Sequence, residues 1–381
     1  MTFKNSIDRK EIFPEPELPK GSDLLSEGRS LARDWGVEKN AFTAHYDVAS
    51  EHEYKRRCMA EGRVMQHAQV GFRDVERTCE AYRTVWQECA ARDVVIDRIG
   101  VCLDWSMAVP RDQRAKATRG TGMILSDPET CARLAAQAPV APHFGDFVLG
   151  FPAAIENTQL VLAAGSTAIG NFGQYFTFRV PRWDDDIETT RATLVAMGLI
   201  AAQPVPILVH SNIDDGFAAQ FTDLTSSLGM MEIERQIVED LIGANMSHCF
   251  GHHFSDPLTR LAFQRASARM TDTPGTMIYG NTTSYRGTVA ENYASLARYL
   301  NVDAIGQSLK PTGHAVNAVP VTENERIPDI SEIVDAQLFS GRLIQLRDTL
   351  LPLIELDQAD QIVEVMVDGA MQFKNNVMAG L

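Results

Sequence analysis

The stretch VPILVH (205–210) is followed by GMMEIERQIVEDLI (229–242) and then by ANMSHCF (244–250). The first and last are short apolar runs, and in the segment between them Met230, Ile233, Ile237 and Leu241 recur at helical spacing. A strand, an amphipathic helix and a second strand in this order are typical of parallel strands joined by a right-handed crossover. This stretch therefore predicts a β/α repeat.

The same alternation extends from about residue 94 to about residue 321. Strands are predicted at 94–103, 140–149, 167–172, 205–210, 244–250, 276–280 and 302–307, with 315–321 or 122–125 as an eighth. Helices are predicted between them at 153–164, 187–199, 229–242, 257–270 and 288–300. Because no G-x-G-x-x-G or P-loop fingerprint is present, the pattern favours a (β/α)8 TIM barrel over an open doubly wound sheet.

The remainder of the chain is predicted to surround this barrel. Residues 1–50 combine prolines and charges without periodicity, which indicates an extended arm. Residues 51–92 are predicted to form a helical segment on the barrel, because an apolar seam runs from Ala68 to Cys89 in steps of three and four. Residues 93–381 then comprise the barrel and two closing helices, at about 329–350 and 358–379. The arm and the seam are candidate oligomer contacts, and a core-packing role for the seam stays open.

Charge and composition exclude several classes of protein. The 381 residues carry a formal charge of -15, which disfavours binding to nucleic acid or to an anionic membrane. No apolar run approaches the ~20 residues of a membrane span, and the first residues lack the apolar core of a secretion signal. The six cysteines have no C-x-x-C spacing. We therefore expect a soluble cytoplasmic protein without disulfides.

Polar residues gather immediately after the predicted strands. In a barrel these positions share the carboxyl-terminal face, where catalytic groups lie. Six of the nine histidines fall in these elbows, and this predicts an enzyme. The general acid–base or substrate-binding candidates are His143, Asp146, His210 and His252. The candidates for hydrogen bonding to a substrate are Asn171, Gln174, Arg179, Asn212 and Asn281, with Arg119 or Arg179 as the anchor for a carboxylate.

Two other interpretations of the elbows remain open. In the first, the chain is a metal-dependent barrel enzyme, such as a hydrolase, a lyase or a corrinoid-linked methyltransferase, that binds zinc. Its possible ligands are His143, Asp146, His210, His248, Cys249 and His252. In the second, the chain is a non-catalytic barrel that serves as a subunit scaffold.

From residue 140 onward the chain resembles the barrel subunit of adenosylcobalamin-dependent glutamate mutase, also called methylaspartate mutase. The resemblance lies in the elbow AGSTAIGNFGQY (164–175), in the helix and strand at 229–250, and in KPTGH (310–314) followed by PVTE (320–323). It implies a radical isomerase whose barrel mouth receives adenosylcobalamin. It also implies that Lys310, with Gly313 and His314, contacts the adenosine end of the cofactor, and that Tyr175 lines the substrate cavity.

The sequence departs from that family at several positions, and these differences restrict the expected substrate and partner. Gly170 or Asn171 stands where the family has a glutamate for the substrate amine, and the segment 143–146 lacks the family's carboxylate-binding arginine, for which Arg98 or Arg119 is a substitute. We therefore expect a less charged substrate than glutamate, because an unpaired buried carboxylate is costly. The D-x-H-x-x-G signature of cobalamin binding is absent. The expected partner is thus a separate small cobalamin-binding subunit in a hetero-oligomer.

Overall fold

The computed structural model of this chain describes residues 16–117, 119–213, 224–250, 256–280 and 285–380. Within these ranges the chain is a mixed α/β structure with parallel strands. No helix in the described ranges combines the length and the apolar character that a membrane crossing requires.

The strands form two four-stranded parallel sheets. The first has the order β3 (Ala141–His143), β2 (Arg98–Val101), β1 (Met65–Val70), β8 (Ala315–Asn317). The second has the order β4 (Ala168–Ile169), β5 (Leu208–Asn212), β6 (Asn245–Phe250), β7 (Met277–Ile278). A single parallel bridge between Phe144 and Ile169 connects the end of β3 to β4. The two sheets are therefore neighbours along this edge.

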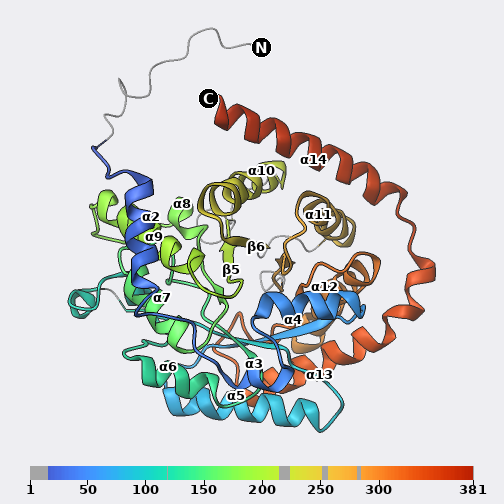
Figure 1. Ribbon diagram of the computed structural model, residues 1–381. Coiled ribbons are helices and arrows are strands. Elements are labelled where there is room, and N and C mark those ends of the chain that lie inside the picture. The colour runs from blue at the N-terminus through green and yellow to red at the C-terminus, as the bar shows by residue number, and fades with distance from the viewer. Residues whose placement is uncertain (1–15, 118, 214–223, 251–255, 281–284, 381) are drawn as a thin grey trace.

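The helices that follow the strands lie around the two sheets in chain order (Figure 1). They are α5 (Val75–Ala90), α6 (Pro128–Ala135), α7 (Ala154–Ala163), α9 (Asp186–Ala201), α10 (Leu224–Arg235, with a π-helical continuation Gln236–Ile242), α11 (Pro257–Met270), α12 (Val289–Leu309) and α13 (Ile330–Leu346). The additional helices are α2 (Gly21–Leu31), α3 (Ala41–Tyr46), α4 (Glu51–Ala60), α8 (Gln174–Thr177) and α14 (Asp357–Met378). Most of the predicted helices are thereby confirmed.

Local sequence explains where these helices begin. The carboxylates of Asp127 and Asp256 accept hydrogen bonds from backbone N–H groups of the first turns of α6 and α11, and each aspartate is followed by a proline at the first helical position. At the start of α12, Thr288 and Glu291 form a reciprocal capping box. These caps satisfy N–H groups that have no partner within the helix.

Side chains alternate along the strands between the helices and the space between the sheets. On β1, the Gln66 amide bonds to Gln337 of α13, and Ala68 and Val70 belong to the main apolar core. The residues between them, His67 and Gln69, point the other way, as the period of two in a strand requires. On β1 the outer face is therefore largely apolar, and its inner face carries His67 and Gln69.

Two predictions of secondary structure were wrong. The helical segment predicted over 51–92 is interrupted by β1, because Gly62 adopts a positive φ of 65° after α4 and Gly71 follows the strand. The apolar seam thus begins within a strand and continues into α5. The strand predicted over 302–307 is the second half of α12, which continues to Leu309.

Two further expectations need revision. The arm predicted over 1–50 is not uniformly extended, since its described part contains α2 and α3. Of the two candidates for the eighth strand, 315–321 contains β8 (Ala315–Asn317), which is shorter than predicted, whereas in 122–125 Met123 makes an isolated bridge to Leu103.

Helix α2 packs closely against α9, and this contact yields a first prediction. A Cβ added at Gly28 would lie 2.0 Å from the carbonyl oxygen of Val195 and 2.9 Å from the Cα of Gly198. We expect Gly28→Ala to lower the free energy of unfolding by about 1–3 kcal/mol, because backbone atoms must move apart. Urea unfolding measures the change. Gly36→Ala is the matched control, since no atom lies within 4 Å of its added Cβ; equal losses in both variants would contradict this explanation.

Candidate functional site

Five buried polar side chains come together between the two sheets. His67 on β1 is in register with Arg98 on β2 and with Asn317 on β8. The ring of His143, at the end of β3, lies 6.1 Å from that of His67 and 4.8 Å from that of His210 on β5. All five are at most 3% exposed. We call His67, Arg98, His143, His210 and Asn317 the inner polar layer.

Helix α4 closes this layer at the amino-terminal edge of the strands. The Glu51 carboxylate lies 3.1 Å from the Nε of Arg98 and 3.2 Å from the Nζ of Lys55. Lys55 also donates a hydrogen bond of 2.9 Å to the carbonyl of Gly313, just before β8. All three charged side chains are buried. The ion cluster therefore holds Arg98 from the amino-terminal side and ties α4 to the segment before β8.

The histidines of the inner polar layer are neutral at pH 7. Burial lowers the pKa values of His67, His143 and His210 well below their usual range, and the nearby positive charge of Arg98 lowers them further. Burial also lowers the pKa of Lys55. Neutral imidazoles can accept a hydrogen bond at one ring nitrogen and donate at the other.

The carboxyl-terminal edge brings together several of the predicted site residues. The Asn171 amide donates to Asp146 at 3.4 Å, and its oxygen accepts from the backbone N–H groups of Gly173 (3.1 Å) and Asn212 (2.7 Å). The Gln174 oxygen accepts a 3.1 Å hydrogen bond from the N–H of Phe147. The Gly170–Asn171 peptide bond in this loop is cis. Asn171 and Gln174 thus hold the loops after β3, β4 and β5 together.

A hollow of about 350 Å³ lies beside Asp146 and Gln174. Its aromatic walls include Phe147, Phe178 and Trp105, which is 52% exposed. The Cys102 thiol at this hollow accepts a 3.2 Å hydrogen bond from the Gln69 amide, whose oxygen is 3.0 Å from the Nε2 of His67. Burial raises the pKa of Cys102 to about 12, so the side chain stays a thiol. We call this the edge hollow.

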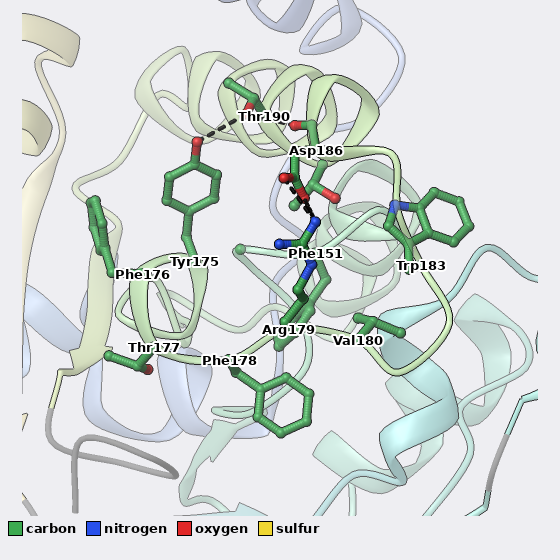
Figure 2. Close-up of a pocket in the computed structure, with 12 residues that line it drawn as sticks. Phe151, Tyr175, Phe176, Thr177, Phe178, Arg179, Val180, Trp183, Asp186 and Thr190 are labelled. Carbon is green, nitrogen blue, oxygen red and sulfur yellow. Dashed lines mark hydrogen bonds and ion pairs between the residues drawn. The ribbon is translucent and has the colours of Figure 1, made fainter. Parts of the chain in front are cut away.

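An outer hollow of about 540 Å³ adjoins the edge hollow through Thr177 and Phe178. Figure 2 shows Tyr175 and Arg179 in its wall, between α8 and α9. The Tyr175 hydroxyl is 2.9 Å from that of Thr190, and Arg179 makes two hydrogen bonds of 2.9 and 3.0 Å to Asp186. Both residues therefore lie outside the inner polar layer.

The predicted cofactor-binding residues lie at the opposite edge. Lys310 ends α12 and donates to the carbonyl of Ala268, while Gly313 accepts from Lys55. His314 is buried, and burial lowers its pKa well below the usual value. Because 302–307 is helical, this segment precedes β8 and lies at the amino edge. The placement of Lys310, Gly313 and His314 at the barrel mouth was therefore wrong.

The other predicted residues are not part of these clusters. Arg119 is exposed, and no contact places it against the inner polar layer. His252 and Asn281 lie outside the described residues. In the ranges that are described, no three His, Cys, Asp or Glu side chains are grouped so that they could hold a metal ion.

Sequence reasoning missed several residues of the site. His67, Glu51 and Lys55 were assigned to one continuous helix, although the alternation in QHAQV (66–70) is a strand signal. Asn317 was not identified because the segment 310–314 before it was predicted to follow a strand, and not to precede one.

Comparison with known proteins adds no assignment to this geometry. No protein-family model matches the chain, and no curated protein matches it either. The inner polar layer and the two hollows beside it are therefore the features that bear on function.

Proposed function

We propose that this chain is the barrel subunit of an adenosylcobalamin-dependent isomerase that rearranges a small polar substrate. The observation that carries the proposal is the inner polar layer. The interiors of (β/α)8 barrels are usually filled with branched apolar side chains, whereas three neutral histidines, Asn317 and Arg98 occupy the space between these two sheets. Buried polar groups are costly unless they bind something. A polar substrate held between the sheets accounts for them.

The proposal takes the two sheets as halves of one (β/α)8 barrel. The Phe144–Ile169 bridge supports closure on one side. On the other side, the Gly275 N–H donates a 2.6 Å hydrogen bond to the Thr312 carbonyl, joining the segments that enter β7 and β8. The order of the helices around the strands agrees with this closure (Figure 1). The carboxyl edge is then the mouth of the barrel.

The edge hollow is a suitable site for the adenosyl end of the cofactor. A flat nucleoside can stack on the exposed Trp105 ring or on Phe178, and Gln174 and Asp146 offer hydrogen bonds beside them. When bound, adenosylcobalamin supplies a carbon radical that abstracts hydrogen from the substrate. A separate small subunit is proposed to bind the rest of the cobalamin, since this chain lacks the D-x-H-x-x-G signature.

The chain's own residues would bind and orient the substrate. His143 and His210 are neutral and 4.8 Å apart, so each can accept a proton or a hydrogen bond. Arg98 is held by Glu51 and contributes positive potential from below. The closed amino edge excludes water from this space, which strengthens every polar contact within it.

Retention of the cofactor by the assembled complex tests this proposal. The chain is mixed with candidate small subunits and adenosylcobalamin, and bound cofactor is measured after gel filtration. We expect retention with a cognate small subunit, weakened roughly 5- to 100-fold by Trp105→Ala through loss of stacking. Lys310→Met is the matched control and should retain the cofactor normally, because Lys310 lies at the amino edge. No retention with any small subunit, or a loss confined to Lys310→Met, would refute the assignment.

A further inference from the structure

Three atoms of the inner polar layer have no hydrogen-bond partner in the part of the chain that the structure describes. They are the Nδ1 of His67, the Nε2 of His143 and the Oδ1 of Asn317. All three side chains are at least 98% buried, so bulk water does not reach them freely. Buried polar atoms without partners are rare in native proteins, and each one indicates a missing ligand or water.

The two histidines are acceptors at these atoms. The other ring nitrogen of His143, Nδ1, is 3.4 Å from the Ala168 carbonyl, which can only accept, so Nδ1 carries the proton. The Nε2 of His67 is 3.0 Å from the Gln69 oxygen, and that amide donates its own N–H to Cys102. The proton of His67 is therefore on Nε2. In neutral rings, the Nδ1 of His67 and the Nε2 of His143 are lone pairs.

Asn317 offers a third acceptor beside them. Its Oδ1 can only accept a hydrogen bond, and Asn317 is the direct neighbour of His67 in the register of β8 and β1. In-register residues of parallel strands point to the same face of the sheet. The missing ligand therefore presents hydrogen-bond donors to three acceptors, which rules out a carboxylate or a phosphate at this position.

The charge of the surroundings decides which kind of donor fits. Arg98 is the direct neighbour of His67 on β2, and Lys55 lies below it, with Glu51 placed between these two cations. The positive potential of Arg98 reaches the histidine rings, as their lowered pKa values indicate. An ammonium group would be repelled by this potential. A neutral hydrogen-bond donor would not be repelled by it.

We infer that the inner polar layer binds a neutral polyhydroxy substrate, whose separate hydroxyl groups donate one hydrogen bond each to His67, His143 and Asn317. The inference rests on the proposed function, because it assumes that this space is the substrate site, and it names the substrate class as a neutral hydroxyl compound. An amide N–H is the other neutral donor with the same chemistry, and the experiment separates the two.

Nuclear magnetic resonance of the full chain with ¹⁵N-labelled histidine tests the inference without cobalamin. The neutral hydroxyl probes are 1,2-ethanediol and glycerol. Acetamide is the amide probe, glycolate is the anionic probe, and protonated 2-aminoethanol is the cationic probe. We expect ethanediol and glycerol to shift the unprotonated Nδ1 of His67 and Nε2 of His143 saturably, at millimolar concentration. The charged probes should bind at least about tenfold more weakly. The exposed His45 is the internal control and should not move.

The outcomes separate this inference from the proposed function. Asn317→Ala should weaken glycerol binding about fivefold to tenfold through loss of one acceptor; if that variant does not fold, the titration of the unmodified chain still decides. Saturable shifts only with acetamide would assign the donor to an amide, and shifts only with a charged probe, or with none, would overturn the inference. Hydroxyl binding without cofactor retention would leave the subsite standing and refute the cobalamin function.

Discussion

Replacing Glu51 with glutamine is expected to lower the free energy of unfolding by about 3–5 kcal/mol. The substitution keeps the shape of the side chain and removes the negative charge between Arg98 and Lys55, which lie 3.1 and 3.2 Å from it. Both buried cations would then lose the carboxylate that they share, and removing one partner of a buried ion pair is strongly destabilising. Urea unfolding monitored by circular dichroism measures the change.

Two comparisons isolate the buried charge as the cause. Glu88→Gln removes an ion pair with Arg92 in which both side chains are about half exposed, so its effect should be at most about 0.5 kcal/mol. Combining Glu51→Gln with Lys55→Met should restore part of the lost stability, because one unpaired cation is also removed. A loss below about 1 kcal/mol for Glu51→Gln would show that water reaches this cluster, and the amino edge would then not be closed.

Mild acid is expected to destabilise the fold steeply. His67, His143 and His210 have pKa values below those of the unfolded chain, mainly because they are buried. At a pH between the unfolded-state pKa of about 6.5 and the lower folded-state pKa, the unfolded chain binds more protons than the folded chain. The stability contributed by these histidines is therefore complete above about pH 6.5 and is lost as the pH falls below it. Each such histidine contributes a slope of about 1.4 kcal/mol per pH unit.

A pH series of urea unfolding from 7.5 to 5 measures this slope. His67→Gln should reduce the dependence of the unfolding free energy on pH by the contribution of one histidine. His45→Gln, at an exposed position, should leave this dependence unchanged. Constant stability from pH 7.5 to 5 would mean that the histidines are not held neutral by burial.

The β/α repeat was the part of the fold that the sequence could predict. Runs of apolar residues and helical spacing placed α7, α9, α11 and the strands β2 to β6 close to their observed positions. The errors arose where both periods were satisfied at once. In 65–72 a few apolar residues of a strand also fit the spacing of a helical seam. In 302–307 a β-branched and apolar run resembles a strand, but it belongs to α12, the helix that begins at the capping box of Thr288.

The candidate site was only partly predictable for the same reason. His143, Asp146, His210, Asn171 and Gln174 follow strands that were located correctly, and the structure brings them to one edge or to the space below it. Lys310 and His314 were assigned to the wrong edge, because a helix had been read as a strand. Which elbow residues point inward depends on register, and a shift of one residue reverses it. Composition alone does not determine register.

The most direct test of the central claim is electron paramagnetic resonance of the assembled complex. The chain, its cognate small subunit, adenosylcobalamin and a neutral hydroxyl substrate are mixed and frozen during turnover. We predict a cob(II)alamin signal coupled to an organic radical, which His143→Gln reduces at least about 100-fold while the variant keeps its cofactor. A complex that retains adenosylcobalamin but shows no such signal with neutral hydroxyl compounds, or an unchanged signal in His143→Gln, would contradict it.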